Sequence, residues 1–345
     1  TLMRSSAASD VYKRQGRAHV AGLLPYPCKC SELSVALQQS KSNAVRLSQK
    51  ITGFLHNGVS TLWYFAVMAV KENFRNYVGR AGRTEGALSD ELALLANGPS
   101  LADELPRLLA GARAGCDFLA VNYFAEHEAF ERLRPAYYVL SDPQFFRASA
   151  QRDRVAALYR TLARKVTWPM TLYVQYYNPE RFDYRAALPN GHIRIVPFHT
   201  QPYRGFRRLE FWLYRHGLGS ANFGTVIQHG EYVGLLLGYR TLHLYGVDHT
   251  LTEGLTVDRR NRLCRIDRHF YDDGRPAEAH PMYVNATCPP VPYTMASYMA
   301  ELAELFRGHE VLRDYAASLG ARIVNHTRTS MIDAYERAAD DRPST

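Results

Sequence analysis

From residue 89 onward, short apolar runs alternate along the chain with longer stretches in which apolar residues recur at helical spacing. This alternation is typical of βαβ units, in which parallel strands are joined by crossover helices. Strands are predicted at 92–96, 118–121, 137–140, 171–175, 193–196, 241–245 and 322–324. Helices are predicted at 101–112, 125–133, 152–164, 205–216, 225–237, 293–306 and 311–319. The fold class expected is α/β: a Rossmann-like, mostly parallel sheet flanked by helices.

The part of the chain before residue 89 follows a different pattern. Residues 32–75 are predicted to be helical, and residues 59–70 form the most apolar stretch of the sequence. That stretch is too short to span a bilayer, which needs about 20 apolar residues. Since Lys71, Arg75, Arg80 and Arg83 follow it, the helix either lies against acidic lipid headgroups at residues 59–83 or packs as a core helix.

Three segments are therefore expected. Residues 1–15 resemble translated sequencing-adapter read-through and are treated as non-native. Residues 16–88 form a helical N-terminal extension, with membrane association as one of its two interpretations. A loop rich in Gly and Arg at 79–89 precedes the catalytic domain, which is expected to cover 89–340.

Composition and charge limit the classes of molecule that the protein is expected to bind. The 345 residues are 46% hydrophobic and 22% charged, which indicates a folded protein. The net charge of +9 suits an anionic partner, but the arginines are scattered and no nucleic-acid-binding motif is present, so we expect a nucleotide and no nucleic acid. The five cysteines lack the spacing of a zinc site, apart from the tight pair Cys28 and Cys30, and no signal peptide is visible. These features favour a cytoplasmic protein with reduced thiols. If residues 59–83 bind lipid, the protein would be peripheral at the inner membrane.

The clearest candidate site is the turn after the first predicted strand. It reads Asn97-Gly98-Pro99-Ser100 and leads directly into a helix, whose first N–H groups are free to hold an anion. Gly98 lets the backbone approach a ligand, and Ser100 is placed to cap the helix. Helix capping and an ordinary turn would explain the same residues without a ligand.

Further polar residues follow other predicted strands. Asn122 and Asp142 come after two neighbouring strands, and Gly246, Asp248 and His249 follow the buried strand at 241–245. In an open parallel sheet ligands bind beyond the carboxyl ends of the strands, so these side chains are expected to share one site. Each alone also fits a turn or a structural histidine. The acidic residues Asp248, Asp272 and Asp273 are also compatible with a magnesium site.

Taken in chain order, these residues resemble those of the bacterial sialyltransferases that act on lipooligosaccharide. The resemblance is carried by Asn97-Gly98-Pro99-Ser100-Leu101, Asn122, Asp142-Pro143 with Phe145-Phe146, Gly238-Tyr239-Arg240, Leu244-Tyr245-Gly246-Val247-Asp248 and His269-Phe270-Tyr271. The first and fifth of these motifs are also similar to the wider MptE-like family, named for 6-hydroxymethylpterin diphosphokinases. The resemblance covers about residues 92–338.

The sialyltransferase resemblance implies a site and a mechanism. A CMP-activated sugar would be bound by Asn97, Gly98, Pro99, Ser100, Asn122 and Asp142, with Thr225, Gly246 and Asp248 completing the pocket. His269 would be the general base of an inverting transfer to a glycan or glycolipid acceptor, assisted by Asp248 and His249, and no metal or other cofactor would be required. A diphosphokinase-like enzyme would instead need Mg²⁺ and ATP. A third alternative is a nucleotide-binding protein without catalysis.

The sequence departs from the sialyltransferase pattern at two places. Asp142 stands where the family has Asn, and His249, Thr250 and Thr252 stand where the family has tyrosines that hold the leaving phosphate. His249 is therefore a candidate for the phosphate contact. Residues 177–208 have no counterpart in the family, and we expect them to form an acceptor-side lid or surface decoration.

Overall fold

The computed structural model describes residues 29–87, 89–147, 152–266, 279–284 and 290–338, with side chains from residue 48 onward. The chain divides after Leu55 into two compact units. Of the first unit, the structure describes the beginning of helix α1 (Lys29–Lys71), and the second unit contains the rest of the chain. Within the described residues, no helix combines the length and the apolar character needed to cross a membrane.

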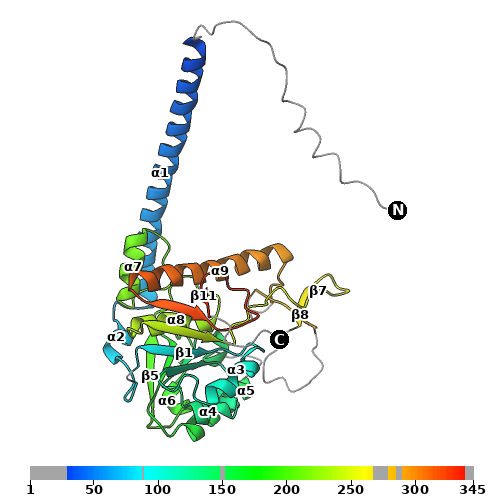
Figure 1. The fold of residues 1–345 in the computed structure, drawn as a ribbon. Coiled ribbons are helices and arrows are strands. Elements are labelled where there is room, and N and C mark those ends of the chain that lie inside the picture. The colour runs from blue at the N-terminus through cyan, green and yellow to red at the C-terminus, as the bar shows by residue number, and fades with distance from the viewer. Residues whose placement is uncertain (1–28, 88, 148–151, 267–278, 285–289, 339–345) are drawn as a thin grey trace. The chain divides into compact units, whose positions relative to one another are not determined.

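The second unit is built on an eight-stranded sheet in which every pair of neighbouring strands is parallel. The strand order is β11-β10-β6-β1-β2-β3-β4-β5, and helices cover both faces (Figure 1). The strands are β1 (Glu91–Leu95), β2 (Asp117–Val121), β3 (Tyr137–Leu140), β4 (Met170–Gln175), β5 (Ile193–Phe198), β6 (Thr241–Tyr245), β10 (Arg322–Asn325) and β11 (Glu336–Arg337). This is a Rossmann-like α/β fold with a helical N-terminal segment, as predicted.

Alternate residues of each central strand enter two different cores. Leu92 and Leu94 of β1 belong to one apolar cluster, whereas Ala93 and Leu95 belong to the other, and all four are fully buried. In a strand that is buried on both faces, no side chain reaches solvent. The strands therefore appear in the sequence as continuous apolar runs.

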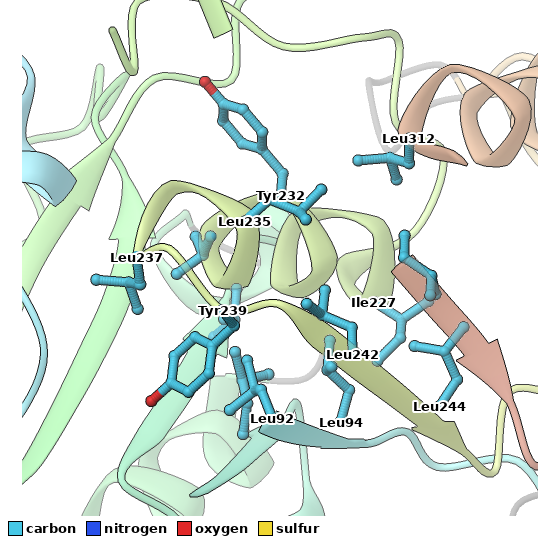
Figure 2. Close-up of a cluster of buried hydrophobic side chains, with 14 of the residues drawn as sticks. Leu92, Leu94, Ile227, Tyr232, Leu235, Leu237, Tyr239, Leu242, Leu244 and Leu312 are labelled. Atoms are coloured by element: carbon cyan, nitrogen blue, oxygen red, sulfur yellow. The ribbon is translucent and has the colours of Figure 1, made fainter. Parts of the chain in front are cut away.

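Helix α8 (Val226–Leu236) packs closely on the first face of the sheet. Figure 2 shows its Ile227 on the side of the helix that faces Leu242 and Leu244 of strand β6, whereas Tyr232 points away from the sheet. The close packing depends on two glycines. A β-carbon on Gly230 would lie 3.0 Å from Leu119, and one on Gly234 would lie 2.8 Å from Leu92. The helix axis therefore lies nearer the sheet than larger residues would allow.

The other elements complete the two layers and the edges. The second face of the sheet carries α3 (Leu101–Leu109), η1 (Phe124–Glu126), α4 (Ala129–Leu133), η2 (Pro143–Phe145), α5 (Arg152–Lys165) and α6 (Tyr184–Ala187). Helices α7 (Arg207–Arg215) and α9 (Met295–Ser318) contribute to the first core, and β7 (Leu255–Val257), β8 (Leu263–Ile266) and β9 (Ala279–Pro281) form a small antiparallel sheet.

Residues before β1 also pack into the second unit. Tyr64 and Met68 of α1 are buried against Tyr203, Leu213 and Leu218. Helix α2 (Tyr77–Ala81) follows and places the buried Val78 in the first core. These side chains pack as a core helix would, and the membrane interpretation of residues 59–83 stays a prediction. The predicted functional boundary at residue 88 stays a prediction.

The predicted strands of the main sheet are confirmed to within two residues at either end, but three other expectations were wrong. The helix predicted at 125–133 is divided into the 3-10 helix η1 and the short helix α4. Helices were predicted at 293–306 and 311–319 with a break between them, yet α9 is continuous. Gly308 lies inside this helix and does not end it. Glycine is needed there because a β-carbon would lie 2.6 Å from Nε2 of Gln228, a residue of α8. Residues 177–208 are not decoration, since they supply the edge strand β5 and the buried Tyr203.

Candidate functional site

A cavity of about 660 Å³ lies beyond the carboxyl ends of β1, β2 and β6. Strand β1 has β2 on one side and β6 on the other. The chain adds β2 to β5 on the first side and then returns to add β6 on the second, so the cavity lies where the strand order reverses. Open α/β sheets bind their ligands at this position, and the volume suits a nucleotide-sized molecule. The lining residues include Asn97, Gly98, Pro99, Asn122, Thr225, Val226, Ile227, Gly246, Asp248, His249, Glu253, Arg265 and Ile266.

Two glycine-containing turns form the floor of the cavity and touch each other. The Gly98 N–H donates a hydrogen bond of 2.9 Å to the Gly246 carbonyl oxygen. Gly246 has φ of +68°, a conformation that side chains disfavour, and a β-carbon on it would lie 2.7 Å from Leu101 Cβ. Glycine is therefore required at both positions by the contact between the turns.

Asp248 fixes the start of α3 from inside the protein. Its Oδ2 accepts hydrogen bonds from the Ser100 hydroxyl at 2.8 Å and from the Ser100 N–H at 3.4 Å, and its Oδ1 accepts one from the Thr329 hydroxyl at 2.7 Å. The side chain is 5% exposed. Because a carboxylate already occupies the N-terminal end of α3, a second anion at that helix terminus would be repelled.

The N-terminus of α8 is the other helix start that faces the cavity, and it carries no such carboxylate in the described part of the chain. Gln228 Oε1 accepts hydrogen bonds from the N–H groups of Gly224 and Thr225, at 2.9 and 3.3 Å. Val226 and Ile227, the first two residues of α8, line the cavity. First-turn N–H groups have no partner within their own helix, and together with the helix dipole they bind anions. An anion was predicted to bind at the N-terminus of α3. The structure favours the N-terminus of α8 for this role.

Three buried oxygen atoms in the cavity wall lack a hydrogen-bond partner among the described residues. They are Oδ1 of Asn97, Oδ1 of Asn122 and Oγ1 of Thr225. The Asn97 amide nitrogen donates to the Val121 carbonyl at 3.2 Å, which directs its oxygen elsewhere. A buried polar atom without a partner costs about 1–3 kcal/mol. Three such atoms around one cavity offer hydrogen-bonding positions to a polar ligand.

His249 lies half-buried at the cavity with a strained backbone, since its φ is +51°. Burial, reinforced by the neighbouring His309, lowers the pKa of His249 to about 3, so its imidazole is neutral at physiological pH. The two rings lie 5.1 Å apart, and Nε2 of each is buried without a described partner. His309 Nδ1 in turn lies 2.8 Å from the hydroxyl of Tyr335, which donates a hydrogen bond to the fully buried Glu231.

Comparisons with known proteins identify only distant structural similarity. No protein-family model matches the chain, and no curated protein does. One similar solved structure is that of MAf glycosyltransferase from Magnetospirillum magneticum AMB-1, with 12% sequence identity and a TM-score of 0.41. The match covers 77% of this chain and 37% of that protein, so the chain spans little more than a third of its length. A similarity this low leaves the function of this chain to be inferred from its own cavity.

The structure brings most of the predicted site residues together and separates others. Asn97, Gly98, Pro99, Asn122, Thr225, Gly246, Asp248 and His249 all line the cavity. Ser100 and Asp142 do not line it: Ser100 is engaged by Asp248, and Asp142 is exposed in the turn after β3. His269, Asp272 and Asp273 lie outside the described residues. Their predicted roles stay predictions.

Sequence reasoning missed the cation that the structure places at the cavity. Arg265 comes from β8, and its Nη1 donates to the Tyr298 hydroxyl at 2.8 Å. Strand β8 is a short piece of a small sheet, so its apolar run is too brief to be distinguished from a loop. A guanidinium is suited to bind carboxylate or phosphate.

Proposed function

We propose that this chain is a glycosyltransferase that binds a CMP-activated sugar, sialic acid or a related nonulosonate, in the cavity at β1, β2 and β6. The observation that carries the proposal is the convergence of an available helix N-terminus, at α8, with the unpartnered oxygens of Asn97, Asn122 and Thr225. Such a set offers an anion site and hydrogen-bonding positions for a base or ribose. The sugar-transfer chemistry rests on the resemblance of the motifs to bacterial sialyltransferases.

The charge distribution favours a donor with a single phosphate. The N-terminus of α8 can hold one anionic group, whereas the carboxylate of Asp248 occupies the corresponding position at α3. A nucleoside triphosphate would bring further negative charge toward Asp248 and would need a compensating cation. A CMP-linked sugar carries one phosphate and places less charge there.

The sugar's own carboxylate would meet Arg265. Nonulosonates carry a carboxylate beside the reacting carbon, and the guanidinium is the cationic side chain of the cavity among the described residues. Its hydrogen bond to Tyr298 fixes one nitrogen of the planar group. Arg265 would then orient the donor by an ion pair.

His269 is the proposed general base. Ile266, three positions earlier, lines the cavity, and a chain segment of three residues reaches about 11 Å at most. In the proposed step the acceptor hydroxyl oxygen bonds to the anomeric carbon and the bond from that carbon to the phosphate oxygen breaks. The hydroxyl proton passes to the His269 imidazole, and CMP leaves with the bonding electron pair. His249 remains neutral and contacts the departing phosphate as a hydrogen-bond donor.

An exposed apolar face of α1 fits a glycolipid acceptor. Val59, Leu62, Trp63 and Val70 recur at helical spacing and are 68%, 74%, 71% and 84% exposed, while Tyr64 on the other side is buried. Basic residues follow at Lys71, Arg75 and Arg80. This arrangement is typical of a helix lying at an anionic lipid surface. We therefore propose an enzyme on the cytoplasmic face of the inner membrane.

Transfer activity tests the proposed function directly. The purified chain would be incubated with CMP-linked sialic acid and a panel of lipooligosaccharide acceptors in the presence of chelator, and products would be identified by mass spectrometry. We expect transfer in the wild type, loss of turnover with intact CMP binding in His269→Ala, and wild-type turnover in the control variant His280→Ala, which changes an exposed histidine of strand β9. Wild-type turnover in His269→Ala would remove this residue as the base.

A further inference from the structure

A second cluster of reactive side chains lies at the amino ends of β1 and β2, at the opposite end of these strands from the cavity. Glu91 is the first residue of β1, Cys116 directly precedes β2, and His243 belongs to the neighbouring strand β6. One oxygen, one sulfur and one nitrogen from these side chains all lie within 4.8 Å of one another. His243 is buried, and the other two are half-buried.

The two distances from Glu91 match those of a tetrahedral metal site. Glu91 Oε2 lies 3.4 Å from Cys116 Sγ and 3.2 Å from His243 Nε2. Zinc bonds of about 2.0–2.3 Å in tetrahedral geometry place neighbouring ligand atoms about 3.3–3.7 Å apart. The side chains therefore need only small adjustments to surround one ion.

Hydrogen bonding fixes which nitrogen of His243 carries a proton. The Arg113 guanidinium, which can only donate, lies 3.2 Å from His326 Nε2, so that nitrogen is an acceptor. His243 Nδ1 lies 2.9 Å from the same His326 nitrogen and must be the donor. In the neutral ring this leaves the lone pair of His243 Nε2 directed at the Glu91 carboxylate. Two acceptors then face each other, and a metal ion between them would be bound by both.

One positive charge lies close to the cluster. Arg113 Nη1, 3.9 Å from Glu91, opposes a cation, but a thiolate and a carboxylate together neutralise a divalent ion.

We propose that Glu91 Oε2, Cys116 Sγ and His243 Nε2 bind one Zn²⁺ ion, with a fourth ligand supplied from a neighbouring cavity of about 410 Å³. Binding displaces the thiol proton of Cys116 to solvent and forms a zinc–sulfur bond with no change of oxidation state. His326 is a positioning residue, because it holds the Nδ1–H of His243 and so directs Nε2 toward the ion. The site is independent of the nucleotide cavity.

Cobalt titration of the whole chain tests this site. Co²⁺ replaces zinc in such sites, and its visible spectrum and sulfur-to-metal charge-transfer band report tetrahedral geometry and a thiolate ligand. The chain used carries Cys28→Ser and Cys30→Ser, which removes the tight cysteine pair. We expect one equivalent of Co²⁺ with a charge-transfer band, displaced by Zn²⁺, with release of a proton.

Two cysteine variants distinguish the cluster from other sites. Cys116→Ser should abolish the charge-transfer band, whereas Cys264→Ser, which changes a buried cysteine of β8, should retain it. Melting temperatures without metal show that each variant folds, and Zn²⁺ should raise the melting temperature of the wild type and of Cys264→Ser only. A band that persists in Cys116→Ser, or the lack of any band in the parent chain, would overturn the proposal.

Discussion

A β-carbon on Gly98 would lie 1.9 Å from Oδ2 of Asp248 and 2.4 Å from the carbonyl oxygen of Gly246. Asp248 cannot move freely, because it is held by Ser100 and Thr329. The Gly246 carbonyl is held by its hydrogen bond from the Gly98 N–H. We expect Gly98→Ala to lower the free energy of unfolding by about 1–3 kcal/mol, the usual cost of overpacking, and to weaken nucleotide binding. Urea denaturation and calorimetric titration measure the two effects.

Gly191→Ala is the control for this variant. Its β-carbon would have no neighbour within 4 Å, and the backbone there is not in the positive-φ region. We expect its unfolding free energy to stay within about 0.5 kcal/mol of the wild type. Equal stability of Gly98→Ala and the wild type would show that the two turns are not in contact.

The Asn122 side chain should contribute to ligand binding and not to folding. Its φ is 51°, so Asn122→Gly removes the amide without straining the backbone, and its Oδ1 has no described partner to lose. We expect CMP to bind about tenfold more weakly, which is about 1.4 kcal/mol, with little change in stability. Asn261→Gly, at an exposed position with φ of 57°, should change neither quantity. Unaltered CMP affinity in Asn122→Gly would place the nucleotide elsewhere.

Stability should fall as the pH drops below about 6.5, in part because of His229. This residue of α8 is 8% exposed, and burial lowers its pKa to about 3. The unfolded chain therefore binds a proton between pH 6.5 and 3 that the folded chain does not. We expect a loss of about 2 kcal/mol between pH 7 and pH 5 from this histidine.

His229→Phe tests the assignment, since phenylalanine suits the contacts of the ring with Phe198 and Phe223 and does not titrate. Unfolding free energies at both pH values should show a smaller pH dependence in this variant than in the wild type. His280→Phe, at an exposed position, should keep the wild-type dependence. An unchanged slope in His229→Phe would contradict a depressed pKa at this site.

The exposed apolar face of α1 should carry the lipid contact. We expect Leu62→Glu with Trp63→Glu to reduce binding to anionic vesicles about tenfold or more, because two apolar side chains that would be buried in the interface become charged. Vesicle sedimentation measures the binding, with neutral vesicles for comparison. Val257→Glu, which changes an exposed apolar residue of β7, should bind like the wild type. If the double variant sediments as well as the wild type, another surface makes the contact.

The sheet could be predicted from the sequence because burial on both faces leaves an unbroken apolar run at every central strand. Helix α9 could not be delimited in the same way. Gly308 resembles a helix stop in the sequence, and only its contact with Gln228 shows why glycine is needed within the helix.

The composition of the cavity was partly predictable for a related reason. Polar residues directly after strands, such as Asn97 and Asn122, lie at the same sheet edge by topology alone. The role of Asp248 as the partner of Ser100 was not predictable, since 148 positions separate the two residues. The same holds for the cluster of Glu91, Cys116 and His243, which no spacing rule for metal ligands would find.

Calorimetric titration with CMP, in the presence of chelator and again with ATP and Mg²⁺, tests the central claim most directly. The account predicts that CMP binds without metal, that Asn122→Gly weakens this binding and that ATP with Mg²⁺ does not compete. Binding of ATP only, and only with Mg²⁺, would contradict a sugar-nucleotide site and favour a diphosphokinase-like enzyme.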